Sequence, residues 1–259
     1  MSPFDYLADR LAELKTRHRF RSLVPRQAEG AAFIDAAQRR MLNFGSNDYL
    51  GLAASRSSSS IAAAASGSTA SPLVCGWTPL HQQLAERIAT LEGTESAVLF
   101  PSGYAACSGT IATLAEAGDL ILSDELNHAS LIEGCRLSRA ECIVYPHRDH
   151  EFVASTLADR RDRFTRVWIV TDGVFSMDGH VAPLRQLAEL AERFTATLIV
   201  DEAHGTGVLG QTGSGLCEAF ELKDRVPIRI GTLSKAIGCQ GGFVAGPKVV
   251  TEYLVNRCR

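Results

Sequence analysis

Long apolar runs are missing from this sequence. No stretch approaches the roughly 20 apolar residues that a membrane-spanning helix needs. Near the N-terminus, Asp5, Asp9, Arg10 and Glu13 interrupt the leucines, which excludes the apolar core of a signal peptide there. We therefore expect a cytoplasmic protein without a membrane partner.

Clusters of basic residues and paired cysteines are also missing. The formal net charge is −3 and the arginines and lysines are scattered, so we expect no nucleic-acid partner. The cysteines are odd in number and show no CxxC spacing, which argues against a disulfide or zinc framework. We expect seven reduced thiols and no metal site, the cysteines being Cys75, Cys107, Cys135, Cys142, Cys217, Cys239 and Cys258.

The composition is that of a globular chain. Its 259 residues are 46% hydrophobic and 21% charged, enough for one large core or for a large and a small domain. Leucines at helical spacing predict a helix over residues 5–17, and a short strand is expected at Met41–Phe44. The serine- and alanine-rich residues 53–72 predict a loop. We assign residues 1–45 to an N-terminal helix and arm, and residues 46–259 to one large domain.

Beyond residue 78, apolar runs of four to six residues alternate with amphipathic segments. Such alternation is typical of an α/β fold, with a mostly parallel sheet and helices on both of its faces. We expect strands at 96–100, 119–124, 141–146, 166–172, 196–201 and 227–231, and helices at 78–93, 101–118, 128–138, 150–164 and 183–194.

Polar side chains follow the ends of these strands, where open parallel sheets bind their ligands. Each has an ordinary structural role when taken alone, since "SGY" can cap a helix and His128 can be a loop residue. Together they match the needs of pyridoxal phosphate (PLP). The cofactor requires a helix N-terminus for its phosphate, a carboxylate for its ring nitrogen, a flat partner for its ring and a lysine amine for its aldehyde. The candidates are Ser102, Gly103, Tyr104, Asp124, Asn127, His128, Asp172, Ser176, Asp201, His204 and Lys235.

The segment around Lys235 resembles a known family. "TLSKAIGCQG" fits the lysine-attachment pattern of class-II PLP enzymes. The sequence is similar to α-oxoamine synthases in "NFGSNDYLGL", "LVCGWTPLHQQLAERIATLEG", "LSDELNHASLIEGCRLS", "TDGVFSMDGHVAPL" and "DEAHGTGVLGQTGSG". The resemblance implies a fold-type I PLP-dependent transferase that acts as a homodimer. It also implies an acyltransferase that condenses an amino acid with an acyl-CoA or acyl-carrier-protein thioester and releases carbon dioxide.

The resemblance also implies roles for individual residues. Lys235 forms the internal aldimine and removes the substrate Cα proton. Asp201 pairs with the ring nitrogen, and His128 stacks on the ring and touches the substrate. The remaining assignments are Gly103 and Tyr104 at the phosphate, His204 at the phenolic oxygen, Ser176 and Thr232 as further anchors, and Arg21 near the acyl-chain entrance.

Three functional alternatives stay open. The first is condensation of alanine with a pimeloyl thioester, a step of biotin biosynthesis, which "HGTGVLG" after Glu202 favours. The second is a glycine C-acetyltransferase that uses glycine and a short acyl-CoA. The third is a truncated PLP-binding chain with little activity, because family members continue for roughly a hundred residues more as a small C-terminal domain. Asp172 also stands where the family usually has glutamate.

Overall fold

The structure is a computed structural model that describes residues 3–35, 37–54 and 67–258. Its contacts divide the chain into two compact units, Met1–Gly45 and Ser46–Arg259, and each is described by itself. Residues 55–66 of the segment expected as a loop lie outside the described residues.

The first unit consists of one helix and a small antiparallel sheet. Helix α1 (Asp5–Thr16) confirms the predicted helix. Strands β1 (Gln27–Glu29), β2 (Ala32–Ile34) and β3 (Arg40–Leu42) pair in that order. The bounds Met41–Phe44 expected for a strand here were wrong, since β3 ends before Asn43. The Asn43 side chain accepts the N–H of Gly45 at 3.2 Å, and this turn ends the strand.

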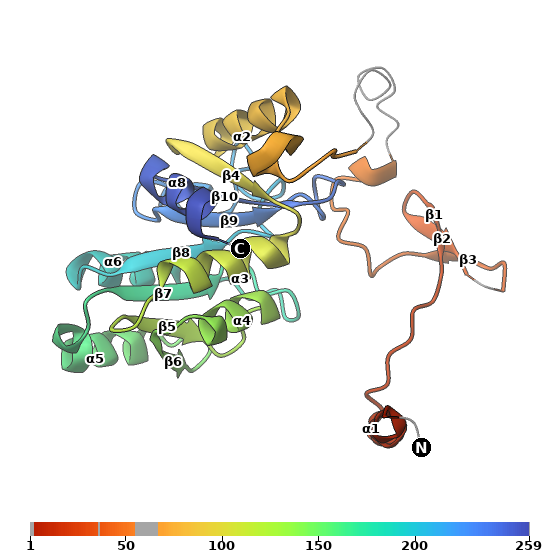
Figure 1. Cartoon of the computed structure of the whole chain (residues 1–259), viewed down its shortest axis with the longest axis horizontal. Coiled ribbons are helices and arrows are strands. Elements are labelled where there is room, and N and C mark those ends of the chain that lie inside the picture. Colours follow the sequence, from red (N-terminus) through yellow and green to blue (C-terminus); the bar gives the residue numbers. More distant parts are fainter. Residues whose placement is uncertain (1–2, 36, 55–66, 259) are drawn as a thin grey trace. The chain divides into compact units, whose positions relative to one another are not determined.

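The second unit is a seven-stranded sheet with helices on both faces (Figure 1). The strand order is β4-β10-β9-β8-β7-β5-β6, and only β10 runs antiparallel to its neighbours. The α/β fold with a mostly parallel sheet is therefore confirmed. The strands are β4 (Ser96–Phe100), β5 (Leu120–Asp124), β6 (Glu141–Tyr145), β7 (Val167–Asp172), β8 (Thr197–Asp201), β9 (Ile228–Thr232) and β10 (Gly242–Gly246). The helices are α2 (Pro79–Glu92), α3 (Gly103–Leu114), α4 (Ala129–Leu137), α5 (His150–Arg160), α6 (Leu184–Arg193), α7 (Leu216–Ala219) and α8 (Lys248–Arg257).

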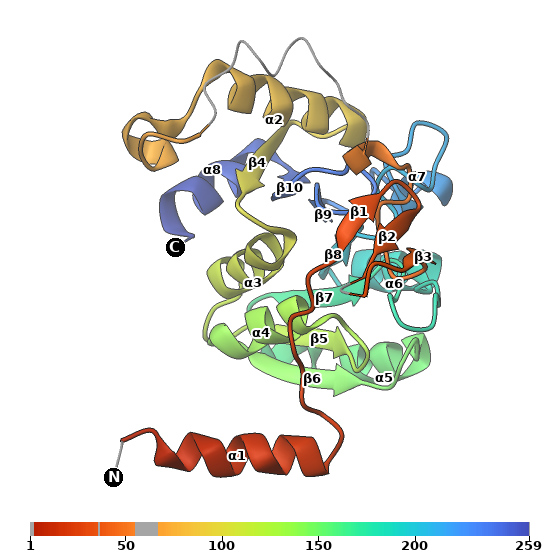
Figure 2. The ribbon, with the colours of Figure 1, turned by 90° about the vertical axis from the view of Figure 1, so that its right-hand side faces the viewer.

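Alternate residues of each central strand enter opposite cores, as the period of two in a strand requires. Leu120 and Leu122 of β5 pack into one cluster with α5 and α6, whereas Ile121 packs into another with α3, α4 and α8 (Figures 1 and 2). Both faces of the sheet are thus covered, and the carboxyl ends of its parallel strands are left as the edge where loops gather. Among the described residues, no helix is long and apolar enough to cross a membrane.

Helix α8 was not predicted from the sequence. Its segment "KVVTEYLVNR" is rich in β-branched residues, which favour strands. Thr251 and Leu254 are buried, and Leu254 packs into the same cluster as α3 and α4. Burial on one helical face has therefore outweighed local propensity.

Candidate active site

Two carboxylates lie side by side at the ends of neighbouring strands. Asp172 ends β7 and Asp201 ends β8, and the two are register partners in the parallel ladder. Both are 5% exposed. Burial raises the pKa of each carboxyl, and the charge of Asp201 contributes further to raise the pKa of Asp172 to about 8. A positively charged group would stabilise two buried carboxylates that repel each other in this way.

Asp201 is held by two donors. The N–H of Ala203 donates to Oδ1 at 2.9 Å, and the thiol of Cys107 on α3 donates to Oδ2 at 3.2 Å. Both hydrogen bonds lower the pKa of Asp201 against the larger effect of burial. From the sequence, Cys107 was expected only as one of seven reduced thiols. Cys107 lies four residues after Gly103, one turn into a helix that begins at the site. This spacing is the signal from which its place at the site could have been predicted.

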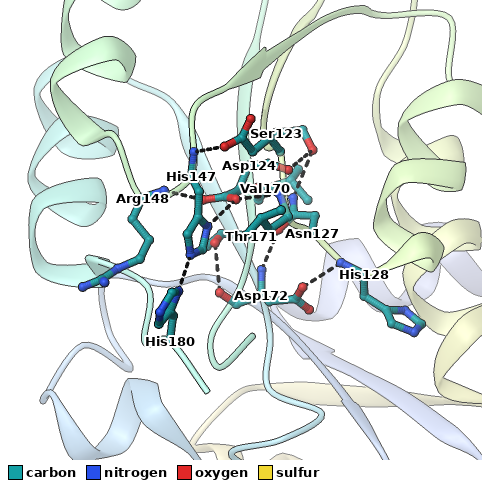
Figure 3. A network of polar contacts seen from close by, with 12 residues as sticks. Ser123, Asp124, Asn127, His128, His147, Arg148, Val170, Thr171, Asp172 and His180 are labelled. Atoms are coloured by element: carbon teal, nitrogen blue, oxygen red, sulfur yellow. Dashed lines mark hydrogen bonds and ion pairs between the residues drawn. The ribbon is translucent and has the colours of Figure 1, made fainter. Parts of the chain in front are cut away.

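A hydrogen-bonded loop connects Asp172 to His128 (Figure 3). The N–H of His128 donates to Asp172 Oδ2 at 2.7 Å. Asn127 accepts the N–H of Asp172 at 2.9 Å and donates to the Val170 carbonyl at 2.9 Å. These bonds fix the β5–α4 loop against the end of β7. The His128 ring lies at the start of α4, where its Nδ1 is 2.7 Å from the Ser130 hydroxyl.

Asp124 belongs to a neighbouring network that ties three loops together (Figure 3). It is buried at the end of β5, and its Oδ1 is 2.9 Å from His147 Nδ1. The other nitrogen of His147 is 2.9 Å from His180 Nδ1, and the N–H of Arg148 donates to Asp124 Oδ2 at 2.8 Å. The loops after β5, β6 and β7 are thereby joined at this edge of the sheet.

Lys235 lies in an irregular turn after β9. Burial lowers its pKa, while the charges of Asp201 and Asp172 act in the opposite direction. The N–H of Gly238 donates to the Lys235 carbonyl at 2.9 Å. Gly238 has φ +67°, and a Cβ there would lie 2.5 Å from the Ala53 nitrogen. The small residues after Lys235 therefore allow the turn to approach the segment around Ala53.

The N-terminus of α3 lies next to β9. The Ser102 side chain accepts the N–H of Ala105 at 3.1 Å and caps the helix. Within the described residues, the N–H groups of Gly103 and Tyr104 donate to no acceptor, so both can bind an anion. A Cβ on Gly103 would lie 3.0 Å from Thr232 Cβ, so a larger residue there would crowd the Thr232 side chain.

His204 follows β8 and its ring contacts Tyr49. Its Nδ1 is 2.6 Å from the Tyr49 hydroxyl. Burial, together with the positive charges of Lys235 and His128, lowers the pKa of His204 to about 4. The ring is therefore neutral near pH 7. Tyr49 was quoted in a motif but given no role, because nothing in the sequence pairs it with a residue 155 positions away.

Within the described part of the chain, three further predicted site residues have no contact with Lys235 or the two buried carboxylates that supports their assigned roles. Ser176 lies exposed in the turn between β7 and α6. Arg21 belongs to the unit Met1–Gly45, and its predicted position at an acyl-chain entrance stays a prediction. Thr232 is at the site, but its hydroxyl already donates to the Gly241 carbonyl at 3.0 Å.

The buried acids give a prediction for the chain without cofactor. The ordinary pKa of Asp172 is 3.8, so the folded chain keeps this proton to higher pH than the unfolded chain does. Its contribution to stability is full below about pH 4 and is lost as the pH rises towards 8. Asp172→Asn should therefore be more stable than the unsubstituted chain at pH 9, by at least about 1 kcal/mol, since one pKa unit corresponds to about 1.4 kcal/mol.

Urea unfolding at pH 4 and pH 9 measures this difference. Asp178→Asn is the matched control, because Asp178 is exposed in the turn after β7 and should show no gain at pH 9. An Asp172→Asn chain that is less stable than the unsubstituted one at both pH values would contradict the argument.

The geometry satisfies the needs of one cofactor. A phosphate can meet the free N–H groups of α3, a pyridinium can meet the buried carboxylate of Asp201, and an aldehyde can meet the Lys235 amine. Such a cluster beyond the carboxyl ends of a mostly parallel sheet defines the class of fold-type I PLP-dependent enzymes.

The comparisons with known proteins identify the family. The chain belongs to the aminotransferase class I and II family, whose model matches residues 39–259. It is 45% identical over 260 residues to a putative 8-amino-7-oxononanoate synthase of Bacillus licheniformis, covering 98% of this chain and 65% of the relative. The chain thus spans slightly less than two thirds of that relative's length.

Solved structures agree with this assignment. Serine palmitoyltransferase of S. paucimobilis, solved with a PLP–myriocin aldimine, has a TM-score of 0.87 at 26% identity, over 99% of this chain and 68% of its own. The 8-amino-7-oxononanoate synthase of Francisella tularensis has a TM-score of 0.67 at 30% identity, over 82% of this chain and 60% of its own. The relatives and structural neighbours are α-oxoamine synthases, so the predicted resemblance is confirmed.

Proposed function

We propose that this chain binds PLP and carries the cofactor site of a decarboxylative condensation between an amino acid and an acyl thioester. The observation that carries the proposal is the convergence of Lys235, two buried carboxylates and a free helix N-terminus at one sheet edge. The relatives named 8-amino-7-oxononanoate synthase favour alanine and a pimeloyl thioester as substrates. We further propose a homodimer located in the cytoplasm.

The geometry supports a phosphate site and a ring site. The N–H groups of Gly103 and Tyr104 bind the phosphate, with the positive end of the helix dipole behind them. The Asp201 carboxylate binds the ring N–H and holds the proton there, since two donors already fix its orientation. His128 places its ring against the cofactor from the start of α4. When bound, PLP supplies an electron sink for the carbanion of the amino acid.

Proton transfer is assigned to Lys235. Burial lowers the pKa of this amine, which increases the fraction of the neutral form that can accept a proton. Lys235 takes the proton from the substrate Cα and returns one to the product at the same position. The neutral His204 ring orients the phenolic oxygen by a hydrogen bond. Ser176 is proposed as a further anchor, Thr232 as another beside the α3 N-terminus, and Arg21 as a contact of the acyl chain.

A spectrum and a carbon dioxide assay test the proposal. Addition of PLP to the purified chain should give a visible absorbance band, and its absence would contradict the cofactor assignment. Carbon dioxide release is then measured with alanine and pimeloyl-CoA or the pimeloyl carrier protein, and with glycine and acetyl-CoA. Because the chain spans 65% of the relative's length, the assay includes a version extended by that relative's C-terminal third.

Alanine with a pimeloyl thioester should give the faster release. A preference for glycine and acetyl-CoA would instead identify a glycine C-acetyltransferase. A visible band without turnover in either version would leave PLP binding as the sole function of the site.

A further inference from the structure

The segment around Tyr49 lies against two loops that carry site residues, the loop of His204 and the turn that contains Lys235. Asp48 accepts the N–H groups of Leu52 at 2.9 Å and Ala53 at 3.2 Å, which folds this segment into a compact turn. Ala53 lies against the turn that follows Lys235, as the close approach at Gly238 shows. The segment therefore has a fixed position from which Tyr49 can act.

The Tyr49 hydroxyl meets one nitrogen of His204. The distance from the hydroxyl oxygen to Nδ1 is 2.6 Å, and the ring centroids are 6.1 Å apart. The electrostatic influence of Lys235 and His128 on His204 shows that the imidazole lies among the site residues. With Nδ1 engaged by Tyr49, Nε2 is the nitrogen that can meet a ligand.

The proton count then fixes the tautomer. A neutral imidazole carries one N–H, so one nitrogen donates and the other accepts. Burial raises the pKa of Tyr49, so its hydroxyl keeps its proton and can donate. Two acceptors lie within reach of that proton, His204 Nδ1 at 2.6 Å and Asn47 Oδ1 at 3.2 Å. The shorter distance favours the hydrogen bond from the Tyr49 hydroxyl to His204 Nδ1. Nδ1 then accepts, and the imidazole proton lies on Nε2.

We propose that Tyr49 is a positioning residue that fixes His204 in the Nε2–H tautomer, so that the ring presents a donor to the phenolic oxygen of the cofactor. The role of His204 rests on the proposed function, whereas the tautomer is a property of the chain alone. An Nδ1–H imidazole would present a lone pair to an oxygen that also carries lone pairs. The tautomer therefore decides whether the ring attracts or repels that oxygen.

The tautomer is measured by nitrogen-15 NMR of histidine-labelled chain without PLP. His204→Gln identifies the His204 signals among those of seven histidines. We expect a protonated Nε2 and an unprotonated Nδ1 in the unsubstituted chain, a result that needs no variant to fold. Tyr49→Phe keeps the ring and removes the hydroxyl, and it should shift the tautomer ratio by about fivefold or more, the size expected for one lost hydrogen bond.

Two further variants test whether the effect belongs to the Tyr49 hydroxyl. Tyr253→Phe, on α8, should leave the His204 tautomer unchanged. Asn47→Ala should retain the Nε2–H form, because the amide is the weaker partner of the Tyr49 hydroxyl. An Nδ1–H tautomer in the unsubstituted chain, or an unchanged ratio in Tyr49→Phe, overturns the proposal.

Cofactor spectra provide the functional readout. A donor to the phenolic oxygen stabilises its deprotonated form, so Tyr49→Phe should raise the pH midpoint at which the PLP absorbance changes, and Tyr253→Phe should not. An unchanged midpoint with a changed tautomer overturns the link to the cofactor. A chain that binds no PLP contradicts the proposed function, while the tautomer measurement still tests Tyr49.

Discussion

Replacing Lys235 with alanine should abolish the visible absorbance band and the covalent attachment of PLP. Lys235 is the lysine that lies beside Asp172 and Asp201, and burial lowers the pKa of its amine. Burial favours the unprotonated amine that reacts with an aldehyde, and it outweighs the opposite effect of the two carboxylate charges. Borohydride treatment of the PLP-loaded chain, followed by peptide mass spectrometry, should find the cofactor on the peptide that contains Lys235. Some PLP should still bind Lys235→Ala through the N–H groups at the start of α3.

Lys248→Ala is the matched control. Lys248 is exposed at the start of α8, and its Nζ is 3.7 Å from the Glu252 carboxylate. Its loss should change neither the band nor the label. Labelling at Lys248 or at Lys223 in the unsubstituted chain, or a band that persists in Lys235→Ala, would show that the wrong lysine has been assigned.

The sequence was sufficient for the sheet and for the residues that end its strands. Apolar runs predicted the strands β4 to β9. Because parallel strands bring their carboxyl ends together, Asp172, Asp201 and Lys235 could be predicted to lie close to one another. The small residues after Lys235 belong to the quoted pattern "TLSKAIGCQG". The structure gives a steric reason for one of them, because a Cβ at Gly238 would collide with the backbone at Ala53.

Contacts between distant segments could not be predicted in this way. Cys107 was expected only as a reduced thiol with no role at the site, yet it donates to Asp201. Tyr49 reaches His204 across 155 positions, and such a pairing follows from how a loop folds back and not from any local pattern. Asp124 was expected among the site residues because of its place at the end of β5. Its bonds to His147 and Arg148 show that it joins loops at the sheet edge.

Asp201→Asn should leave the fold in place and remove most of the proton exchange at the substrate Cα. The asparagine carbonyl can still accept the N–H of Ala203, so the side chain keeps its place at the end of β8. It carries no charge and cannot hold a proton on the ring nitrogen of PLP. The stabilisation of the developing carbanion is then lost, and exchange should fall by about a hundredfold to a thousandfold, as when a fixed electrostatic partner is removed.

Loss of the alanine Cα–H signal in D2O, followed by proton NMR, measures this exchange in the PLP-loaded chain. It requires no acyl thioester, so the result is independent of which thioester is the substrate. The absorbance of bound PLP shows separately that the variant still holds the cofactor. Asp178→Asn, in the exposed turn after β7, should exchange at the unsubstituted rate. Equal rates for Asp201→Asn and Asp178→Asn would mean that the ring nitrogen is not held by Asp201, and Asp172, the second buried carboxylate at this edge, would then be the group to substitute.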